Sequence, residues 1–328
     1  MKKPLFWCIF LSLAPTINYA QSSYNLPQTM IRLCNFSYIT DTTSSKQVVK
    51  DSVQTLGMKV VWGPVELIDD FGVSYSSMYV ANDLTGNYTV VIRGTNYESL
   101  KSWIGEDFQV HKAVKFSRFV KPAPSDAKIS KGTCNGMDDL IKLKDKNNSG
   151  HVVSFLLQAK SMIKGFYVTG HSLGGTLTPP FYAYLCYKIF GGQPPLNINS
   201  SPFSFAGLTA GNKGFNDLLQ TYIQTGDTNW RYVNPLDVAP NLWDGGDAIK
   251  TMYTPYGLPY AAPESDLIDY LIYRAKPNNY VQPDSSKLTL DTVFNTAKNS
   301  WISQAEYQHH STTYISLVDK CYAKRNDQ

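Results

Sequence analysis

Gly170, Ser172 and Gly174 form a G-x-S-x-G pattern, which raises a serine hydroxyl above a sheet edge on a sharp strand-to-helix turn. The residues before it, 166–169, are apolar, aromatic or β-branched and predict a buried strand. The apolar stretch that ends near Phe190 predicts the helix that follows. A serine held in this way is a nucleophile for acyl transfer when a base lies within hydrogen-bonding reach.

A serine nucleophile on this kind of turn works with an acid and a histidine base. In the chain the acid and then the histidine follow the serine, so the base is expected late in the sequence. The chain has five histidines. Three of them do not follow Ser172, which leaves His309 and His310; the three are His111, His151 and His171. Both candidates precede an apolar run, 314–318, that predicts a C-terminal helix. The loop position next to that helix favours His310, with His309 as the alternative base.

The acid is expected just beyond a late strand, at the same edge of the sheet as the serine. Residues 230–234 predict a strand that Pro235 ends, and Asp237 follows. Asp244 and Asp247 lie in a glycine-rich loop and are weaker candidates. Asp237 is therefore the predicted acid.

The elements that must position these side chains alternate between strand and helix. Tyr88 to Arg93 is a continuous buried strand, and 152–163 is a helix that leads into the serine strand. After Phe190 the pattern continues with a strand at 202–206 and a helix at 215–223. Such alternation predicts an α/β fold with a mostly parallel central sheet and helices on both faces.

Composition narrows the classes of partner. The 328 residues are 43% hydrophobic and 17% charged, with a net charge of +4, too small and scattered to predict nucleic-acid binding. The sequence holds no cysteine and histidine cluster with zinc spacing, and the acyl-transfer chemistry needs no cofactor. We therefore expect neither a metal nor a cofactor.

The first twenty residues predict an export signal. Lys2 and Lys3 precede an apolar stretch of about ten residues, Pro15 ends it, and Ala20 suits cleavage. No later apolar run reaches the eighteen residues of a spanning helix, so we expect no integral membrane span. The prediction is a signal peptide at 1–20 and a single domain at 21–328, secreted or periplasmic.

Export permits disulfides among the four remaining cysteines, Cys34, Cys134, Cys186 and Cys321. Sequence does not choose among the three possible pairings. A bridge between Cys34 and Cys321 would clamp the two ends of the mature chain.

Several motifs, in order, resemble the class 3 lipases, the fungal-lipase-like branch of α/β-hydrolases. Residues 90–95 resemble the family's strand that ends in arginine, glycine and serine or threonine. The resemblance implies that Thr95 and the backbone N–H of Leu173 form the oxyanion hole. Trp103 and Ile104 resemble the lid helix, and the amphipathic segment 97–108 fits a cover over an apolar cleft.

The resemblance extends over about residues 60–318. Residues 232–240 resemble the family's acid motif, with Asp237 as the acid. The chain departs from the family at Pro179 and Pro180, which follow the serine where a plain helix is usual. Residues 248–303 match nothing in the family, and we expect them to form part of the acyl pocket wall.

The implied function is a secreted serine lipase or esterase that hydrolyses carboxylic esters of lipids, of the triacylglycerol type, through an acyl-serine. The alternatives are a phospholipase A-type enzyme and a soluble carboxylesterase. A non-enzyme alternative is an inactive lipid-binding protein on the same fold, because fold does not fix function. The expected partners are the lipid ester and, transiently, a lipid surface.

Overall fold

The computed structural model describes residues 24–39, 45–70, 74–94, 109–148, 150–224, 229–244, 246–261 and 264–326. The predicted signal peptide at 1–20 lies outside these ranges. So do Thr95, Trp103, Ile104 and the rest of the predicted lid segment, 97–108. Within the described ranges, no helix has the length and apolar character needed to cross a membrane.

Seven strands form one central sheet in the order β1-β2-β3-β8-β9-β10-β11. β1, β2 and β3 pair antiparallel, and every neighbouring pair from β3 onward is parallel. The strands are β1 Lys59–Ile68, β2 Ser74–Asn82, β3 Asn87–Ile92, β8 Gly165–His171, β9 Asn199–Phe205, β10 Arg231–Val233 and β11 Lys287–Thr289. The carboxyl ends of the parallel strands meet at one edge, where open α/β sheets place their ligand sites.

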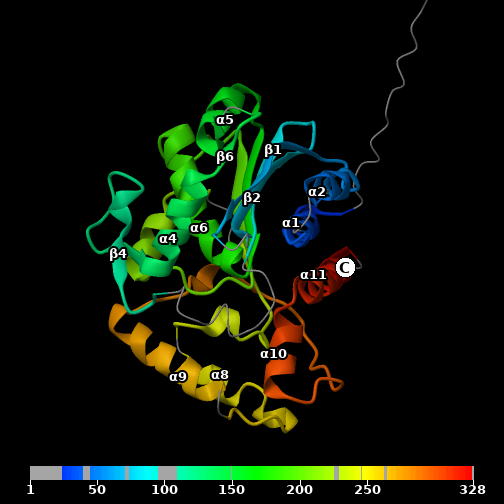
Figure 1. The fold of residues 1–328 in the computed structure, drawn as a ribbon, viewed down its shortest axis with the longest axis vertical. Helices are drawn as coiled ribbons and strands as arrows, with labels where there is room; N and C mark the ends of the chain where they lie inside the picture. Colours follow the sequence, from blue (N-terminus) through cyan, green and yellow to red (C-terminus); the bar gives the residue numbers. More distant parts are fainter. Residues whose placement is uncertain are drawn as a thin grey trace, which may run out of the picture.

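Helices cover both faces of this sheet (Figure 1). One face carries α4 (Lys131–Lys142), α5 (Val152–Ala159), α6 (Leu173–Phe190) and α7 (Lys213–Gln220), and the other carries α1 (Leu26–Phe36), α2 (Ser45–Gln54) and α11 (Ser311–Asn326). Two short ribbons lie outside the sheet, β4 (Ala113–Lys115) with β5 (Lys128–Ser130) and β6 (Lys144–Asp145) with β7 (Gly150–His151). The predicted α/β-hydrolase fold, a mostly parallel sheet between helical layers, is confirmed.

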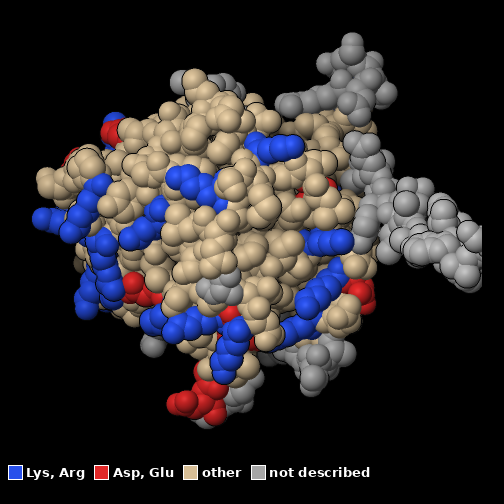
Figure 2. Space-filling view, turned by 90° about the horizontal axis from the view of Figure 1, so that it is seen from above, with Lys and Arg blue, Asp and Glu red and all other residues tan. Residues whose placement is uncertain are grey.

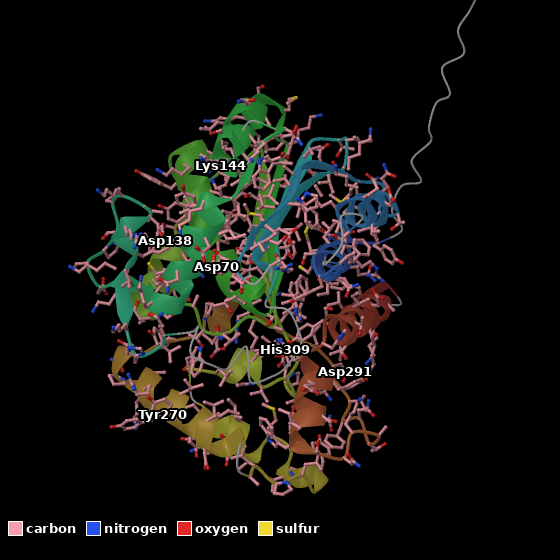
Figure 3. The ribbon with its side chains drawn as sticks, in the orientation of Figure 1. Asp70, Asp138, Lys144, Tyr270, Asp291 and His309 are labelled. Atoms are coloured by element: carbon pink, nitrogen blue, oxygen red, sulfur yellow. The ribbon has the colours of Figure 1, made fainter. Side chains whose placement is uncertain are left out.

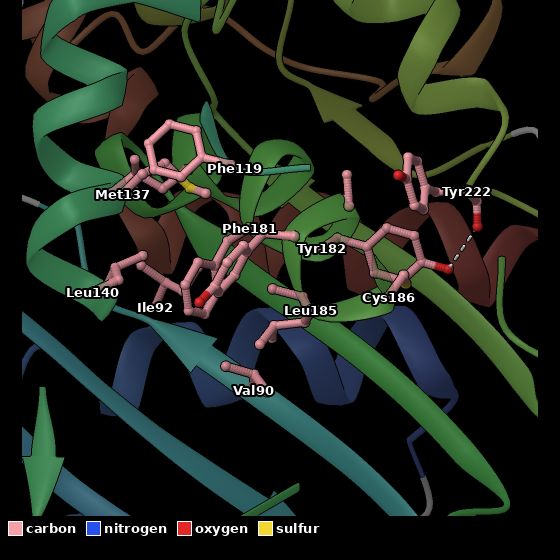
Figure 4. Close-up of a cluster of buried hydrophobic side chains, with 14 of the residues drawn as sticks. Val90, Ile92, Phe119, Met137, Leu140, Phe181, Tyr182, Leu185, Cys186 and Tyr222 are labelled. Carbon is pink, nitrogen blue, oxygen red and sulfur yellow. Dashed lines mark hydrogen bonds between the residues drawn. The ribbon is translucent and has the colours of Figure 1, made fainter. Parts of the chain in front are cut away.

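The apolar run of β3 is buried on both sides, as its sequence predicts. Val90 and Ile92 face a cluster that includes Phe181 of α6 and Met137 of α4 (Figure 4). Val91 faces the opposite cluster, under α1 and α11. The alternation follows from the two-residue period of a strand.

The two prolines after the serine do not break α6, although both lie inside it. Pro179 has no N–H to donate to the carbonyl oxygen of Gly175, four residues earlier. The hydroxyl of Ser204 in β9 donates to that oxygen instead, at 2.8 Å. The oxygen that the proline leaves without its helical partner is therefore paired from the neighbouring strand.

A third layer covers the carboxyl edge of the sheet (Figure 1). It holds α8 (Asp247–Thr251), α9 (Glu264–Ala275) and α10 (Trp301–His309). Its apolar side chains, among them Ile249, Tyr253 and Trp301, form a cluster with Val238, against which Leu173 packs. The described residues of 248–303 that belong to this cluster therefore pack beside the segments that carry the predicted serine and acid.

The two ends of the described chain are joined by an ion pair and not by a disulfide. Arg32 of α1 donates to both carboxylate oxygens of Asp319 in α11, at 2.7 and 3.0 Å. Cys34 is a free buried thiol whose Sγ lies 3.2 Å from Thr169 Oγ1, and Cys321 is also free. The bridge considered between Cys34 and Cys321 is not formed, and Cys134 and Cys186 are buried free thiols too.

Candidate active site

Ser172 lies between β8 and α6 in a strained backbone conformation, with φ of 61° and ψ of −126°. The glycines on either side make this turn possible. A Cβ on Gly170 would overlap the backbone of Gly174, and a Cβ on Gly174 would overlap the carbonyl oxygen of Ile92 in β3. The strand-turn-helix context predicted for the G-x-S-x-G pattern is therefore present, and the turn packs directly against β3.

One histidine connects the serine to the predicted acid. His309 Nε2 lies 2.8 Å from Ser172 Oγ, and His309 Nδ1 lies 2.9 and 3.0 Å from the two carboxylate oxygens of Asp237. All three side chains are buried. A carboxylate accepts, so Nδ1 carries the proton and Nε2 accepts from the serine hydroxyl. Figure 3 shows His309 where α10 meets the edge of the sheet.

The structure brings His309, the alternative base, and not the preferred candidate His310, to the serine hydroxyl. His310 is exposed, and its Nδ1 accepts from the backbone N–H of Thr312 at 3.2 Å. The expected loop before the C-terminal helix does not exist, because α10 ends at His309 and α11 begins at Ser311. His310 is the single residue between the helices, where its side chain caps the start of α11.

Asp237 follows β10, as its position after a strand and a proline predicts. Its carboxylate accepts from the hydroxyl of Tyr314 at 2.8 Å and from the backbone N–H of Ala239 at 2.9 Å. Burial, and the nearby Asp237, hold the pKa of Tyr314 well above its ordinary value, so the phenol remains a donor. The acid is thus held from three sides, and its orientation toward His309 is fixed.

The weaker acid candidates do not join this site. Asp244 accepts from the backbone N–H of Gln282 at 2.6 Å. Asp247 is at the exposed start of α8, where it pairs with Lys250 at 3.5 Å. Neither contacts the histidine.

The end of β3 lies against the serine turn. Gly94, the last described residue before Thr95, is buried, and a Cβ there would lie 3.1 Å from the Cβ of Ser172. Leu173 is the first residue of α6, and the first four N–H groups of a helix have no partner within it. The backbone N–H of Leu173 therefore has no partner within α6 and lies next to the serine in the chain. The side chains of Thr95, Trp103 and Ile104 lie outside the described residues.

Sequence reasoning did not find Tyr314, Tyr38 or His171 as parts of the site. His171 was excluded as a base by chain order, and it does not contact the serine hydroxyl; its Nε2 lies 2.9 Å from the backbone oxygen of His309. Tyr38 Oη lies 2.9 Å from its Nδ1. The position of His171 inside the G-x-S-x-G pattern was the available signal, while the tyrosines carry no local one.

A cavity of about 450 Å³ lies at the other end of β3, between α1 and the turn from β2 to β3. Leu26, Met30, Leu84 and Thr89 are among its lining residues. It lies at the amino end of the parallel strands, whereas such sheets bind ligands at the carboxyl ends. In the described part of the chain, no group of three or more histidines, cysteines and carboxylates could hold a metal.

The fold is that of the α/β-hydrolases, and the contacts of Ser172, His309 and Asp237 have the arrangement of a catalytic triad. Residues 89–244 match the model of the family described as lipase (class 3). The solved structure of M37 lipase is similar, with a TM-score of 0.76 and 28% identity over 90% of this chain and 92% of that one. The match to the family model, over a little under half of the chain, and the similarity to M37 lipase support a lipase of the class 3 type, a carboxylic ester hydrolase.

Two further solved structures align less completely. A mutant form of MDLA from Penicillium cyclopium has a TM-score of 0.45 and 16% identity, over 66% of this chain and 72% of that one. A triacylglycerol lipase from Penicillium expansum has a TM-score of 0.44 and 16% identity, over 68% and 75% of the two chains. No curated protein matches this sequence.

Proposed function

We propose that this lipase hydrolyses lipid esters of the triacylglycerol type, with Ser172 as nucleophile, His309 as general base and Asp237 as the acid that orients it. The observation that carries the proposal is the continuous contact from Ser172 Oγ through both ring nitrogens of His309 to the carboxylate of Asp237. The chain order serine, aspartate, histidine fits the same roles.

The reaction follows from which atoms hold protons. Ser172 Oγ attacks the ester carbonyl while His309 Nε2 takes its proton, and Asp237 stabilises the imidazolium through Nδ1–H. Nε2–H then protonates the leaving alkoxide, which departs as the alcohol and leaves an acyl-serine. A water molecule attacks this ester with His309 again as base, and the acid is released with the serine regenerated.

Thr95 and the backbone N–H of Leu173 are the proposed oxyanion donors, on the family resemblance and on the place of Leu173 at the start of α6. Removing one such donor costs about 10²–10³ in turnover. Trp103 and Ile104 are proposed to belong to a lid over the cleft, which would open against a lipid surface. The apolar cluster that joins Leu173 to residues 248–303 supports a pocket wall for an acyl chain.

Hydrolysis of p-nitrophenyl esters from short to long acyl chains tests the substrate class, with wild type and Ser172→Ala measured side by side. We expect activity that rises toward long chains and falls by a factor on the order of 10⁶ in the variant. A preference for short, soluble esters would replace the lipid-ester proposal by a soluble carboxylesterase. Equal rates in the two proteins would favour a lipid-binding protein without activity.

We also propose that the chain is exported and that residues 1–20 are removed. The support is the sequence of that segment, with two lysines, an apolar stretch and a terminal alanine. The mass of the protein recovered from periplasm and medium should correspond to a chain that starts at Gln21. Recovery of the uncleaved chain in the cytoplasm would contradict export.

A further inference from the structure

His171 is a fully buried histidine with partners on both ring nitrogens. Its Nε2 lies 2.9 Å from the backbone carbonyl oxygen of His309, and its Nδ1 lies 2.9 Å from the hydroxyl oxygen of Tyr38. The partners are 138 and 133 residues away in the chain. The contacts therefore join three distant segments at the proposed catalytic site.

These partners allow one arrangement of protons. A carbonyl oxygen accepts and never donates, so the proton of the neutral ring is on Nε2. Nδ1 is then an acceptor, and the hydroxyl of Tyr38 is the donor. Burial, and the nearby His309, hold the pKa of His171 well below its ordinary value, which agrees with a neutral ring.

We propose that His171 and Tyr38 are positioning residues of the triad: His171 holds the main chain of His309 in place, and Tyr38 fixes the tautomer with which it does so. The inference rests on the proposed function, because it assigns the two residues to the same triad. His171 precedes the nucleophile Ser172 directly. The nucleophile and the base are thereby joined by a second contact besides their own hydrogen bond.

The need for such a contact follows from the place of His309 in α10. It is the last residue of that helix, and the last four carbonyl groups of a helix have no partner within it. His171 Nε2–H satisfies one of these oxygens in the buried interior, where an unpaired group is costly. Without it, the end of α10, and with it the imidazole of His309, would be free to shift relative to Ser172.

Tyr38 brings the N-terminal segment into this site. It lies two residues after α1, outside the part of the chain that matches the family model. Its hydroxyl also lies 3.3 Å from the carbonyl oxygen of His171, and a Cβ on Gly94 would overlap it. Tyr38 thus lies between the serine turn and the end of β3, and the helix that precedes it, α1, is paired with α11 through Arg32 and Asp319.

The test compares two variants of His171 that differ in a donor. Gln places its amide N–H at the distance of Nε2 and can donate to His309, whereas Leu fills similar space and cannot. With a soluble p-nitrophenyl ester, we expect His171→Leu to lower kcat about 10- to 100-fold with KM changed less than about two-fold, the size of effect a small misplacement has. His171→Gln should recover most of the loss, and the exposed neighbour variant His310→Gln should match wild type.

Tyr38→Phe removes one oxygen atom, and it tests the positioning role if His171→Leu does not fold. We expect its kcat to fall about 3- to 10-fold, as for one lost hydrogen bond. In the His171→Leu background the same change should cost almost nothing, because no tautomer remains to be fixed. Equal losses of kcat in His171→Leu and His171→Gln, or a wild-type kcat in Tyr38→Phe, would overturn the inference. Activity that persists in Ser172→Ala would instead overturn the proposed function, so the two failures are distinguishable.

Discussion

At the scale of single residues, the carboxylate of Asp237 is fully buried and has three donors: His309, Tyr314 and the backbone N–H of Ala239. A buried charge is stable when its oxygens are hydrogen-bonded. The same donors fix the direction of the carboxylate, because each oxygen has its own partner besides the histidine. The acid therefore depends on residues that are not in the triad.

Tyr314→Phe removes one of these donors and leaves the ring in place. We expect the free energy of unfolding to fall by about 1.5–3 kcal/mol, the range for a hydrogen bond to a charged group, and kcat to fall roughly 10-fold. Urea unfolding and ester hydrolysis measure the two effects. Tyr322→Phe in the same helix is the control, because its hydroxyl contacts that of Tyr232 at 3.2 Å, remote from Asp237. Equal effects in the two variants would contradict this role of Tyr314.

The buried ring of His171 predicts how stability depends on pH. Its pKa is well below the ordinary 6.5, first through burial and then through His309, so between the two values the unfolded chain binds a proton that the folded chain does not. The contribution of this ring to the free energy of unfolding is fully present above about pH 6.5. It falls as the pH is lowered, by up to about 1.4 kcal/mol per pH unit. His310, whose pKa is also lowered by burial and by His309, acts in the same direction.

Urea unfolding between about pH 8 and pH 5 measures this slope. His171→Gln has no ring to titrate and should reduce the slope, leaving the parts from His310 and from His111, whose pKa is lowered by desolvation and by the nearby Arg274 and Lys112. The carboxylates with lowered pKa values, Asp83, Asp145 and Asp291, act below their ordinary 3.8, outside this range. A slope that is the same in wild type and variant would contradict a neutral His171 in the folded state.

At the scale of elements, the junction of α10 and α11 decides which histidine is the base. One residue separates the two helices, so His309 faces inward from the end of α10 while His310 caps α11. Chain order restricts the base to these two residues. Which of two adjacent side chains faces inward depends on how the helices pack on the sheet, and no local pattern carries that information.

The ion pair between α1 and α11 predicts a measurable contribution to stability. Arg32 binds both oxygens of Asp319, and Gln28 donates to the same carboxylate at 2.8 Å. Arg32→Gln should lower the free energy of unfolding by about 1 kcal/mol, since a bidentate, partly buried pair lies at the upper end for such pairs. The exposed pair of Lys213 and Asp217 in α7 is the control. Lys213→Gln should change stability by less than about 0.5 kcal/mol, and an equal effect would contradict a clamp.

At the scale of the whole molecule, the two ends of the sheet differ in character. The carboxyl edge carries the triad and the apolar layer of α8, α9 and α10. Figure 2 shows the opposite end, where Lys and Arg side chains spread over the face and Asp and Glu lie mainly toward its edge. Lys46, Lys50, Lys144 and Lys146 line a cavity of about 390 Å³ there, together with Glu66 and Asp145. The chemistry and the basic surface are therefore separated by the length of the sheet (Figure 3).

The sequence predicts the fold class and the family resemblance because apolar strand runs and turn glycines are local patterns. The order of the motifs can also be read directly along the chain. Ser172 and Asp237 lie at the same edge of the sheet, because both follow strands whose carboxyl ends share that edge. Residues 248–303 have no such pattern: their helices form a layer through packing on that edge, and Lys287–Thr289 add the last strand of the sheet. The contact of Tyr38 with His171 spans 133 residues, so the fold alone reveals it.

The identity of the base is the central claim, and kcat for a soluble p-nitrophenyl ester in His309→Ala and His310→Ala tests it most directly. The far-UV circular dichroism spectrum and the melting temperature of each variant establish that the compared proteins are folded. We predict that His309→Ala lowers kcat by a factor on the order of 10⁴–10⁶ and that His310→Ala stays within about three-fold of wild type. A large loss in His310→Ala with near-normal turnover in His309→Ala would contradict the account.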